Sequence, residues 1–311
     1  MSAPLHVLVT GASGFVGRHV CAALKASGVR LSCLSRNLSE AAAGQYALDL
    51  LDAATVRQLL ADLRPDCVIH LAASRDSGAE PSAFRATFDT NVRSAWNVIE
   101  GCQTLPHFKR FIFLGSFDEY GRAEPPYVET QQAQPTSAYG LSKLAITQAL
   151  LGLHANYAFP AVVLRPTVIY GPGQGDNMFL PALIRTLLAG QTYAMTRGEQ
   201  TRDFLYVGDA VTAVLKAVQA DASIDGNVIN LGAGHSHSVK SVVEMVLREI
   251  PSAIAAQVQF GAIPYRRHEA MRYAANIERA AALLAWQPTT DLQRGLRATI
   301  DYFVQADHGI D

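Results

Sequence analysis

The sequence feature that most constrains the fold is the stretch LHVLVTGASGFVG at residues 5–17. Leu5–Val9 is a short, almost continuous apolar run rich in valine, which predicts a strand buried on both faces of a parallel sheet. A glycine-rich turn follows, and Arg18–Ser27 has the amphipathic pattern of a helix. The turn carries Gly11, Gly14 and Gly17 in the spacing G-x-x-G-x-x-G. This order predicts a dinucleotide pyrophosphate site, because glycines admit the phosphates close to the backbone and a helix N-terminus offers free N–H groups.

Length and composition limit the possible functions. A chain of 311 residues with 49% hydrophobic and 17% charged residues can form one large or two modest globular domains. The formal net charge of −1 favours neither nucleic acid nor an anionic membrane as a partner, and no apolar stretch reaches transmembrane length. The four cysteines form no C-x-x-C pair, so we expect reduced thiols, a cytoplasmic location and no metal site.

Strand patterns alternate with helix patterns along the first half of the chain. Strands are expected at 31–35, 46–50, 67–71, 111–115 and 161–165, and helices at 51–63, at 83–105 and from residue 136 or 137. This alternation predicts an α/β fold with a doubly wound parallel sheet, of the Rossmann type. Further on, we expect helices at 179–189, 209–220, 239–249 and 292–304, strands at 203–207 and 227–231, and a hairpin-like stretch at 191–202.

The end of the second expected strand bears on the choice of cofactor. An acidic residue there binds the adenosine ribose hydroxyls and repels a 2′-phosphate. This chain has Ser35, Arg36 and Asn37 instead, and a guanidinium with two short polar side chains suits a phosphate dianion. We therefore favour NADP(H) over NAD(H), with a solvated loop cation as the alternative for Arg36. Asp49 has two interpretations: an acceptor for the adenine amino group, or a helix N-cap, for which Asp52 is the better candidate.

Three residues in the middle of the chain predict acid–base chemistry. Ser116 follows the fifth expected strand, and ligands of such sheets bind outside the carboxyl ends of the strands. Tyr139 and Lys143 are four residues apart on the next expected helix, so they share one face. A phenol has a reference pKa of about 10, and a nearby ammonium lowers it. We expect Tyr139 to pass a proton to or from a substrate oxygen that Ser116 orients.

Motifs spread over nearly the whole chain resemble those of the extended short-chain dehydrogenases/reductases that act on nucleotide-linked sugars. The matching motifs, in the family's order, are TGASGFVG (10–17), HLAA (70–73), TNV (90–92), GSFDEYG (115–121), YGLSK (139–143), LRPTVIYGPG (164–173) and RDFLYVGD (202–209). The resemblance implies that Ser116, Tyr139 and Lys143 form the catalytic set. It also implies an NADP(H)-binding Rossmann domain over 1–171 and 204–231, and a smaller α/β domain for a nucleotide-diphosphate sugar over 172–203 and 232–311.

The same resemblance implies two sets of binding residues and a partner. The expected cofactor contacts are Gly11, Ser13, Gly14, Phe15, Val16, Gly17, Arg36, Asn37, Asp49, Leu50, Leu71, Ala72, Ala73, Asn91, Tyr139, Lys143 and Pro166. The expected substrate contacts are Ser116, Phe117, Asp118, Asn177, Arg202 and Arg266, in which the arginines bind the diphosphate through a planar fork of donors. We expect a homodimer, because the helices over 83–105 and 139–157 often pair between subunits in this family.

Three reactions share this machinery. A 4-epimerase oxidises C4 of the sugar and reduces it again on the other face with tightly held NAD, whereas a 4,6-dehydratase needs an extra acid and base. Family dehydratases place carboxylates directly after the serine or threonine, but here the first such position is Phe117 and only Asp118 fits the second. A 4-ketoreductase needs only the catalytic set and NADPH, and GSFDEYG is similar to the GS-x-DEYG of GDP-4-keto-6-deoxymannose reductases.

We therefore expect NADPH-dependent reduction of an NDP-4-keto-6-deoxyhexose. A 4-epimerase is the first alternative, and a dehydratase that uses Asp118 is the second. A non-catalytic NADP-binding redox sensor belongs to a different class of function, and the retained Tyr139 and Lys143 argue against it.

Overall fold

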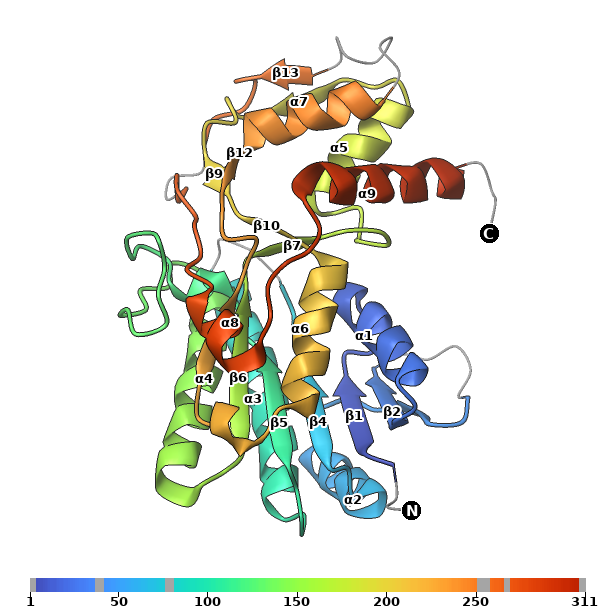
Figure 1. Ribbon diagram of the computed structural model, residues 1–311, viewed down its shortest axis with the longest axis vertical. Helices are drawn as coiled ribbons and strands as arrows, with labels where there is room; N and C mark the ends of the chain where they lie inside the picture. Colours follow the sequence, from blue (N-terminus) through green and yellow to red (C-terminus); the bar gives the residue numbers. More distant parts are fainter. Residues whose placement is uncertain (1–3, 37–41, 76–80, 251–257, 266–268, 308–311) are drawn as a thin grey trace.

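The central element is a seven-stranded parallel sheet with the strand order β11-β6-β5-β4-β1-β2-β3 (Figure 1). The computed structural model describes residues 4–36, 42–75, 81–250, 258–265 and 269–307. The strands are β1 (His6–Thr10), β2 (Arg30–Ser35), β3 (Gln45–Ala47), β4 (Cys67–His70), β5 (Arg110–Leu114), β6 (Ala161–Pro166) and β11 (Val228–Leu231). Because β1 pairs with both β2 and β4, the direction of winding reverses beside β1. The predicted α/β fold with a doubly wound sheet is confirmed.

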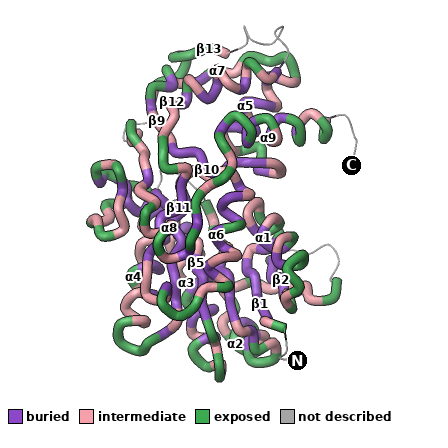
Figure 2. The backbone as a smooth tube through the Cα atoms, in the orientation of Figure 1, coloured by how far each residue is buried: buried purple, intermediate pink, exposed green. Residues whose placement is uncertain are grey.

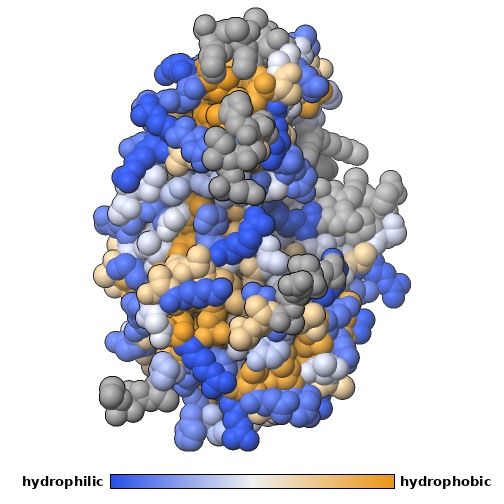
Figure 3. Space-filling view, turned by 90° about the vertical axis from the view of Figure 1, so that its right-hand side faces the viewer, coloured by the Kyte–Doolittle hydropathy of each residue, from blue (hydrophilic) through white to orange (hydrophobic). Residues whose placement is uncertain are grey.

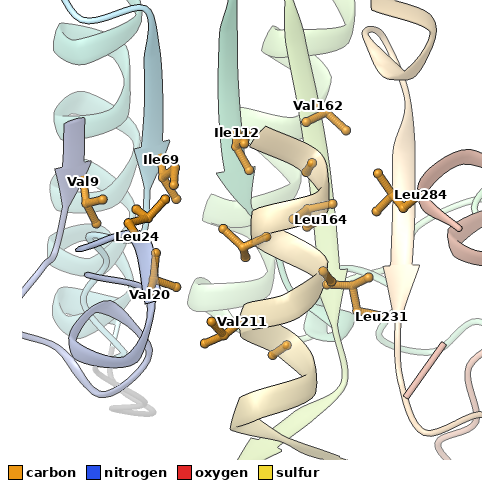
Figure 4. Close-up of a cluster of buried hydrophobic side chains, with 14 of the residues drawn as sticks. Val9, Val20, Leu24, Ile69, Ile112, Val162, Leu164, Val211, Leu231 and Leu284 are labelled. Carbon is orange, nitrogen blue, oxygen red and sulfur yellow. The ribbon is translucent and has the colours of Figure 1, made fainter. Parts of the chain in front are cut away.

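Helices cover both faces of this sheet and bury its strands (Figure 2). They are α1 (Phe15–Ala26), α2 (Ala53–Leu63), α3 (Pro81–Gln103), α4 (Ala138–Tyr157) and α6 (Val207–Gln219). One core cluster packs α1 and α6 against the sheet, as Figure 4 shows for Val20, Ile112 and Val211. A second cluster on the other face joins α2, α3 and α4 through residues such as Leu60 and Ile99. The strands are therefore apolar on both faces, as their sequences predict.

A smaller domain lies beyond the carboxyl ends of the strands (Figure 1). It contains α5 (Phe179–Leu188), α7 (Val239–Glu249) and α9 (Leu292–Asp307), which share a core cluster of their own. Its strands are β7 (Val168–Tyr170), β8 (Tyr193–Met195), β9 (Thr201–Arg202), β10 (Phe204–Tyr206), β12 (His237–Ser238) and β13 (Val258–Phe260). They pair two by two, so this domain is built on short ribbons rather than on a second large sheet.

Two expectations for this part of the chain are wrong. The stretch 191–202 is not a hairpin, because β8 pairs with β13 and β9 pairs with β12, both distant in sequence. The strand after it, β10, pairs with β7 instead of the large sheet, which only β11 rejoins. A strand pattern does not specify which other strand will form hydrogen bonds with its backbone. The expectation that neighbouring segments pair with each other was therefore wrong here.

The helix α8 (Glu278–Leu284) lies with the larger domain, although the expected division placed it with the substrate domain. Ala280, Leu284 and Trp286 belong to the same core cluster as β1 and α6. The indole N–H of Trp286 donates to the Asp209 carbonyl at 3.0 Å, which fixes this segment to the start of α6. The expected division also placed β7 and β10 in the larger domain, but they pair with each other outside the large sheet. The other expected domain boundaries stay predictions.

The surface is mixed in character. On the face that Figure 3 shows, hydrophobic areas are interrupted by hydrophilic side chains. Within the ranges given above, none of the helices combines the length and apolarity that spanning a membrane requires.

Candidate active site

The glycine turn after β1 fits tightly against the loop after β4. Gly11 has φ +69°, and a Cβ atom there would lie 2.7 Å from the backbone nitrogen of Ala72. A Cβ atom at Gly17 would lie 2.1 Å from the Gly11 carbonyl oxygen. Gly14 is the N-cap of α1, so no side chain covers the first N–H groups of the helix. The turn therefore presents bare backbone and a helix N-terminus to the same space, which suits a pyrophosphate.

That space is a cavity of about 330 Å³ at the carboxyl ends of β1, β2 and β4. Ten of the expected cofactor residues line it: Gly11, Ser13, Gly14, Arg36, Asp49, Leu50, Leu71, Ala72, Ala73 and Asn91. Seven further residues line it. Ser35 is one of them and was expected near a cofactor phosphate, and six were not predicted: Leu34, Leu48, Leu51, Ser74, Thr90 and Ser94. Most of these residues are next to predicted residues in the sequence, and Ser94 lies one helical turn from Asn91. This proximity to predicted residues is the signal that could have identified them. The lining suits a dinucleotide chemically, because it combines the bare backbone of the glycine turn with leucine side chains.

Other expected cofactor residues lie around the cavity without lining it. Phe15 and Val16 begin α1 and pack against the sheet's core, and Pro166 ends β6 in a buried position. Gly17 is the buried residue that lets α1 approach the turn. Asn37 lies outside the described residues.

Ser35 and Arg36, at the end of β2, both line the cavity. Arg36 is exposed, whereas Ser35 is buried and its hydroxyl accepts the Ser13 N–H at 3.2 Å. Of the two interpretations of Asp49, the N-cap is wrong, because the Asp52 carboxylate accepts the Thr55 N–H and caps α2. Asp49 instead lies in the cavity wall.

Ser116 is held by a compact turn at the carboxyl end of β5. It is the N-cap of a short 3₁₀ helix, Phe117–Glu119, and its hydroxyl accepts the Asp118 N–H at 3.1 Å. In return, the Glu119 carboxylate accepts the Ser116 N–H at 2.9 Å, which completes a capping box. The buried Glu119 side chain also pairs with Arg165 from β6 at 2.7 Å. The position of the hydroxyl thus depends on a charged pair beneath it.

Tyr139 and Lys143 lie one turn apart near the start of α4, which Ser137 caps by accepting the Gly140 N–H. The lack of a side chain at Gly140 lets the helix approach this turn, since a Cβ atom there would lie 2.4 Å from the Asp118 carbonyl oxygen. The nearby Ser116 side chain lowers the pKa of the Tyr139 phenol. The three expected catalytic residues are therefore neighbours in space.

The electrostatics of this set differ from the expectation. Burial raises the pKa of Tyr139 to about 12, and Lys143 does not reverse this. The Lys143 ammonium donates to the Leu114 carbonyl at 2.7 Å and lies 5.7 Å from the centre of the Tyr139 ring. Burial also lowers the pKa of Lys143 to about 8. The expected lowering of the Tyr139 pKa by Lys143 is therefore not seen here. The expectation that Lys143 and a bound nicotinamide together make the phenol acidic stays a prediction.

Asn91 links the cavity to the catalytic helix. Its buried side-chain amide accepts the Ser74 N–H at 2.7 Å and donates to the Ser74 carbonyl at 3.0 Å. It also donates to the Ser142 hydroxyl at 2.9 Å, which in turn donates to the Tyr139 carbonyl. Asn91 therefore positions both the loop after β4 and α4, a role that its sequence context did not reveal.

Two expected substrate residues beside Ser116 have different environments. The Phe117 side chain is only 2% exposed and packs edge-on against Tyr120 and Tyr127. Its ring is thus part of an interior aromatic cluster, and the expectation that it contacts substrate is wrong for the side chain. Asp118 is partly exposed, and its charge raises the pKa values of Tyr139 and Tyr273. Its carboxylate is therefore near both tyrosines.

Two of the expected substrate contacts, Arg202 and Asn177, lie in the smaller domain. Arg202 donates to the Ala270 carbonyl at 2.8 Å, pairs with the Glu269 carboxylate, and stacks 4.7 Å above the Tyr273 ring. It is therefore held in one orientation by the segment after residue 268. Asn177 is exposed in the loop before α5. Arg266 lies outside the described residues.

A doubly wound sheet with a glycine turn at β1 and a Ser–Tyr–Lys set beside it defines a class: dinucleotide-binding α/β proteins with the catalytic arrangement of short-chain dehydrogenases. The comparison with family models identifies the group within this class. Residues 7–232 match the model of the NAD dependent epimerase/dehydratase family, and the chain belongs to that family. The resemblance inferred from the motifs is confirmed.

Three relatives show the range of reactions among similar proteins. A dTDP-glucose 4,6-dehydratase of Neisseria gonorrhoeae is 27% identical over 96% of this chain and 95% of its own length. A GDP-6-deoxy-D-mannose reductase of Pseudomonas aeruginosa is 27% identical over 94% and 95%. The crystal structure of a UDP-glucuronic acid 4-epimerase from Bacillus cereus, in complex with UDP-glucuronic acid and NAD, has a TM-score of 0.86 and 28% identity, and covers 96% of this chain and 99% of that one.

Proposed function

We propose that this protein reduces the C4 ketone of an NDP-4-keto-6-deoxyhexose with NADPH. The observation that carries the proposal is the local arrangement after β5. The Ser116 side chain lies close enough to Tyr139 there to lower the pKa of its phenol, while the adjacent Phe117 is buried in an aromatic cluster and Glu119 is bound to Arg165. The turn thus keeps the proton donor and its orienting hydroxyl, and its first position after Ser116 supplies no acid for an elimination.

In this proposal each described residue has one task. The glycine turn and Ala72 hold the dinucleotide, and Arg36 faces the 2′-phosphate that distinguishes NADPH from NADH. The bound cofactor supplies the hydride for C4. Ser116 donates a hydrogen bond to the ketone oxygen, and Tyr139 gives its proton to that oxygen as it gains negative charge. Lys143 carries the positive charge that favours the resulting phenolate.

Assays of the purified protein test the proposal directly. NADPH oxidation is followed by absorbance with 4-keto-6-deoxyhexoses linked to GDP, dTDP, CDP or UDP. The expected result is substrate-dependent oxidation of NADPH with one of them. An absence of oxidation with all four would contradict the proposal.

A 4-epimerase is the second candidate, and the similarity to the UDP-glucuronic acid 4-epimerase structure favours it. An epimerase returns the hydride to the same sugar, so it needs no added cofactor. Mass spectrometry of ligands released from the purified protein distinguishes the epimerase from the reductase. Bound NAD, together with isomerisation of an NDP-hexose without added cofactor, would support the epimerase. A dehydratase would instead form a keto-sugar from an NDP-hexose, and Asp118→Asn would abolish that activity.

We also propose that two copies pair through α3 and α4. These helices pack against each other and expose large apolar side chains outward, with Trp96 39% exposed and Tyr157 75% exposed. Packing of two such helix pairs would bury these rings. Light scattering is expected to give twice the mass of one chain, and Trp96→Glu is expected to halve it.

A further inference from the structure

Arg75, a residue to which the sequence analysis assigned no role, lies against the catalytic tyrosine. Its guanidinium carbon is 5.1 Å from the centre of the Tyr139 ring. Arg75 belongs to the loop after β4, and the preceding Ser74 is held by two hydrogen bonds to the Asn91 side chain. The same Asn91 is tied to α4 through Ser142. The loop and the catalytic helix are therefore fixed to each other, which keeps the backbone of Arg75 close to α4. The exposed Arg75 side chain lies against the Tyr139 ring.

The charges around Tyr139 come from three elements. Asp118 and Glu119, from the turn after β5, raise the pKa of the phenol beyond the larger effect of burial. Lys143 faces the ring from the next turn of α4, but its ammonium is bound to the Leu114 carbonyl and lies 4.6 Å from the centre of the Phe113 ring. For Tyr139, Arg75 is the charge that most strongly opposes the rise in pKa caused by burial. Arg75 also lowers the pKa of Lys143.

We propose that Arg75 provides a second positive charge for the proton transfer, and that it stabilises the Tyr139 phenolate left behind. The inference rests on the proposed reduction. In that step the O–H bond of Tyr139 breaks, its proton joins the substrate oxygen, and the hydride that reduces the carbon comes from NADPH. The negative charge that remains on the tyrosine ring lies beneath the Arg75 guanidinium, where a cation is favoured. Arg75 acts through Tyr139 and is therefore a positioning residue.

The experiment compares Arg75→Met, Arg75→Lys and the control Arg57→Met, which changes an exposed arginine on α2. For Arg75→Met we expect kcat for the keto-sugar to fall about tenfold, a loss typical of one charge at this range. The high-pH limb of kcat should move upward by about half a pH unit, because both neighbouring pKa values rise. The Kd of NADPH should not change, Arg75→Lys should recover most of kcat, and Arg57→Met should behave as wild type.

A second readout needs no substrate. In protein with ¹³C-labelled lysines, NMR follows the titration of Lys143, assigned with Lys143→Met, and Arg75→Met should raise its midpoint. If the wild type turns over no keto-sugar, the proposed function fails, and this titration still tests the electrostatic role of Arg75. An unchanged Lys143 midpoint, an effect of Arg75→Met on NADPH affinity alone, or a failure of Arg75→Lys to recover activity would overturn the inference.

Discussion

The carboxylate of Glu119 and the guanidinium of Arg165 form an ion pair at 2.7 Å whose side chains are 0% and 3% exposed. The same carboxylate accepts the backbone N–H of Ser116. The Arg165 guanidinium in turn lies 4.8 Å from the centre of the Tyr120 ring. A buried charge network therefore lies beneath Ser116, the residue proposed to orient the substrate oxygen, and it connects the turn after β5 to β6.

Glu119→Gln is expected to destabilise the fold. The amide oxygen still accepts the Ser116 N–H, but Arg165 becomes an uncompensated buried charge, which costs about 3–5 kcal/mol. Urea unfolding measures the loss. Asp89→Asn, which removes an exposed pair with Arg85, is the matched control and should change the unfolding free energy by less than about 0.5 kcal/mol. If both substitutions changed the unfolding free energy equally, the buried ion pair would contribute no more to stability than the exposed one.

Gly11 and Gly28 have similar positive φ angles but different surroundings. Substituting each by alanine therefore distinguishes the effect of a steric clash from the effect of backbone strain. Gly28 has φ +77° and open space where a Cβ atom would lie, whereas a Cβ atom at Gly11 meets the Ala72 backbone. Gly28→Ala should lose about 1–2 kcal/mol through strain alone. Gly11→Ala should lose more and should also weaken NADPH binding at least about tenfold, because the loop that lines the cavity must move. Unfolding midpoints and fluorescence titration with NADPH check both. NADPH affinity unaltered in Gly11→Ala would argue against a cofactor at this turn.

Arg36 is expected to set the cofactor preference. Arg36→Met removes the cation proposed to bind the 2′-phosphate, and the KM for NADPH should rise about tenfold or more, the value of a charge-assisted hydrogen bond. The KM for NADH, which lacks this phosphate, should stay the same. Steady-state kinetics with both cofactors give the comparison. A parallel rise in both KM values would mean that Arg36 supports the cavity rather than the phosphate.

The pH dependence of the reduction should follow Lys143. Its ammonium must be charged to favour the phenolate, and burial lowers its pKa to about 8. The Tyr139 phenol, with its pKa raised to about 12, keeps its proton throughout this range. We therefore expect kcat to be constant below pH 8 and to fall as the pH rises through that value. A profile flat to pH 10 would contradict this assignment.

Much of the larger domain could be predicted because each of its elements has a local signal. Valine-rich strands and amphipathic helices alternate with short connections, and the glycine turn fixes where the cavity lies. The third strand is shorter than predicted, ending at Ala47, because apolar Leu48 and Leu50 extend the strand pattern into the cavity wall. Long-range pairings were not predictable, and β8 with β13 is an example.

The site was predicted in its members but not in its electrostatics. Ser116, Tyr139 and Lys143 follow from strand-end position and helical spacing. Burial reverses the simple expectation for Tyr139, and burial of a phenol is a tertiary property that residue spacing does not reveal. Arg75 looks like an ordinary loop cation until Asn91 is seen to hold its neighbour Ser74.

The rate of NADPH oxidation by Tyr139→Phe, compared with wild type on the same keto-sugar, tests the proton-donor role most directly. The substitution leaves the ring and its packing in place and removes only the hydroxyl. We expect kcat to fall by about 10²–10⁴-fold while the Kd of NADPH is unchanged. A Tyr139→Phe protein that retained full activity would contradict the assignment of Tyr139 as the proton donor.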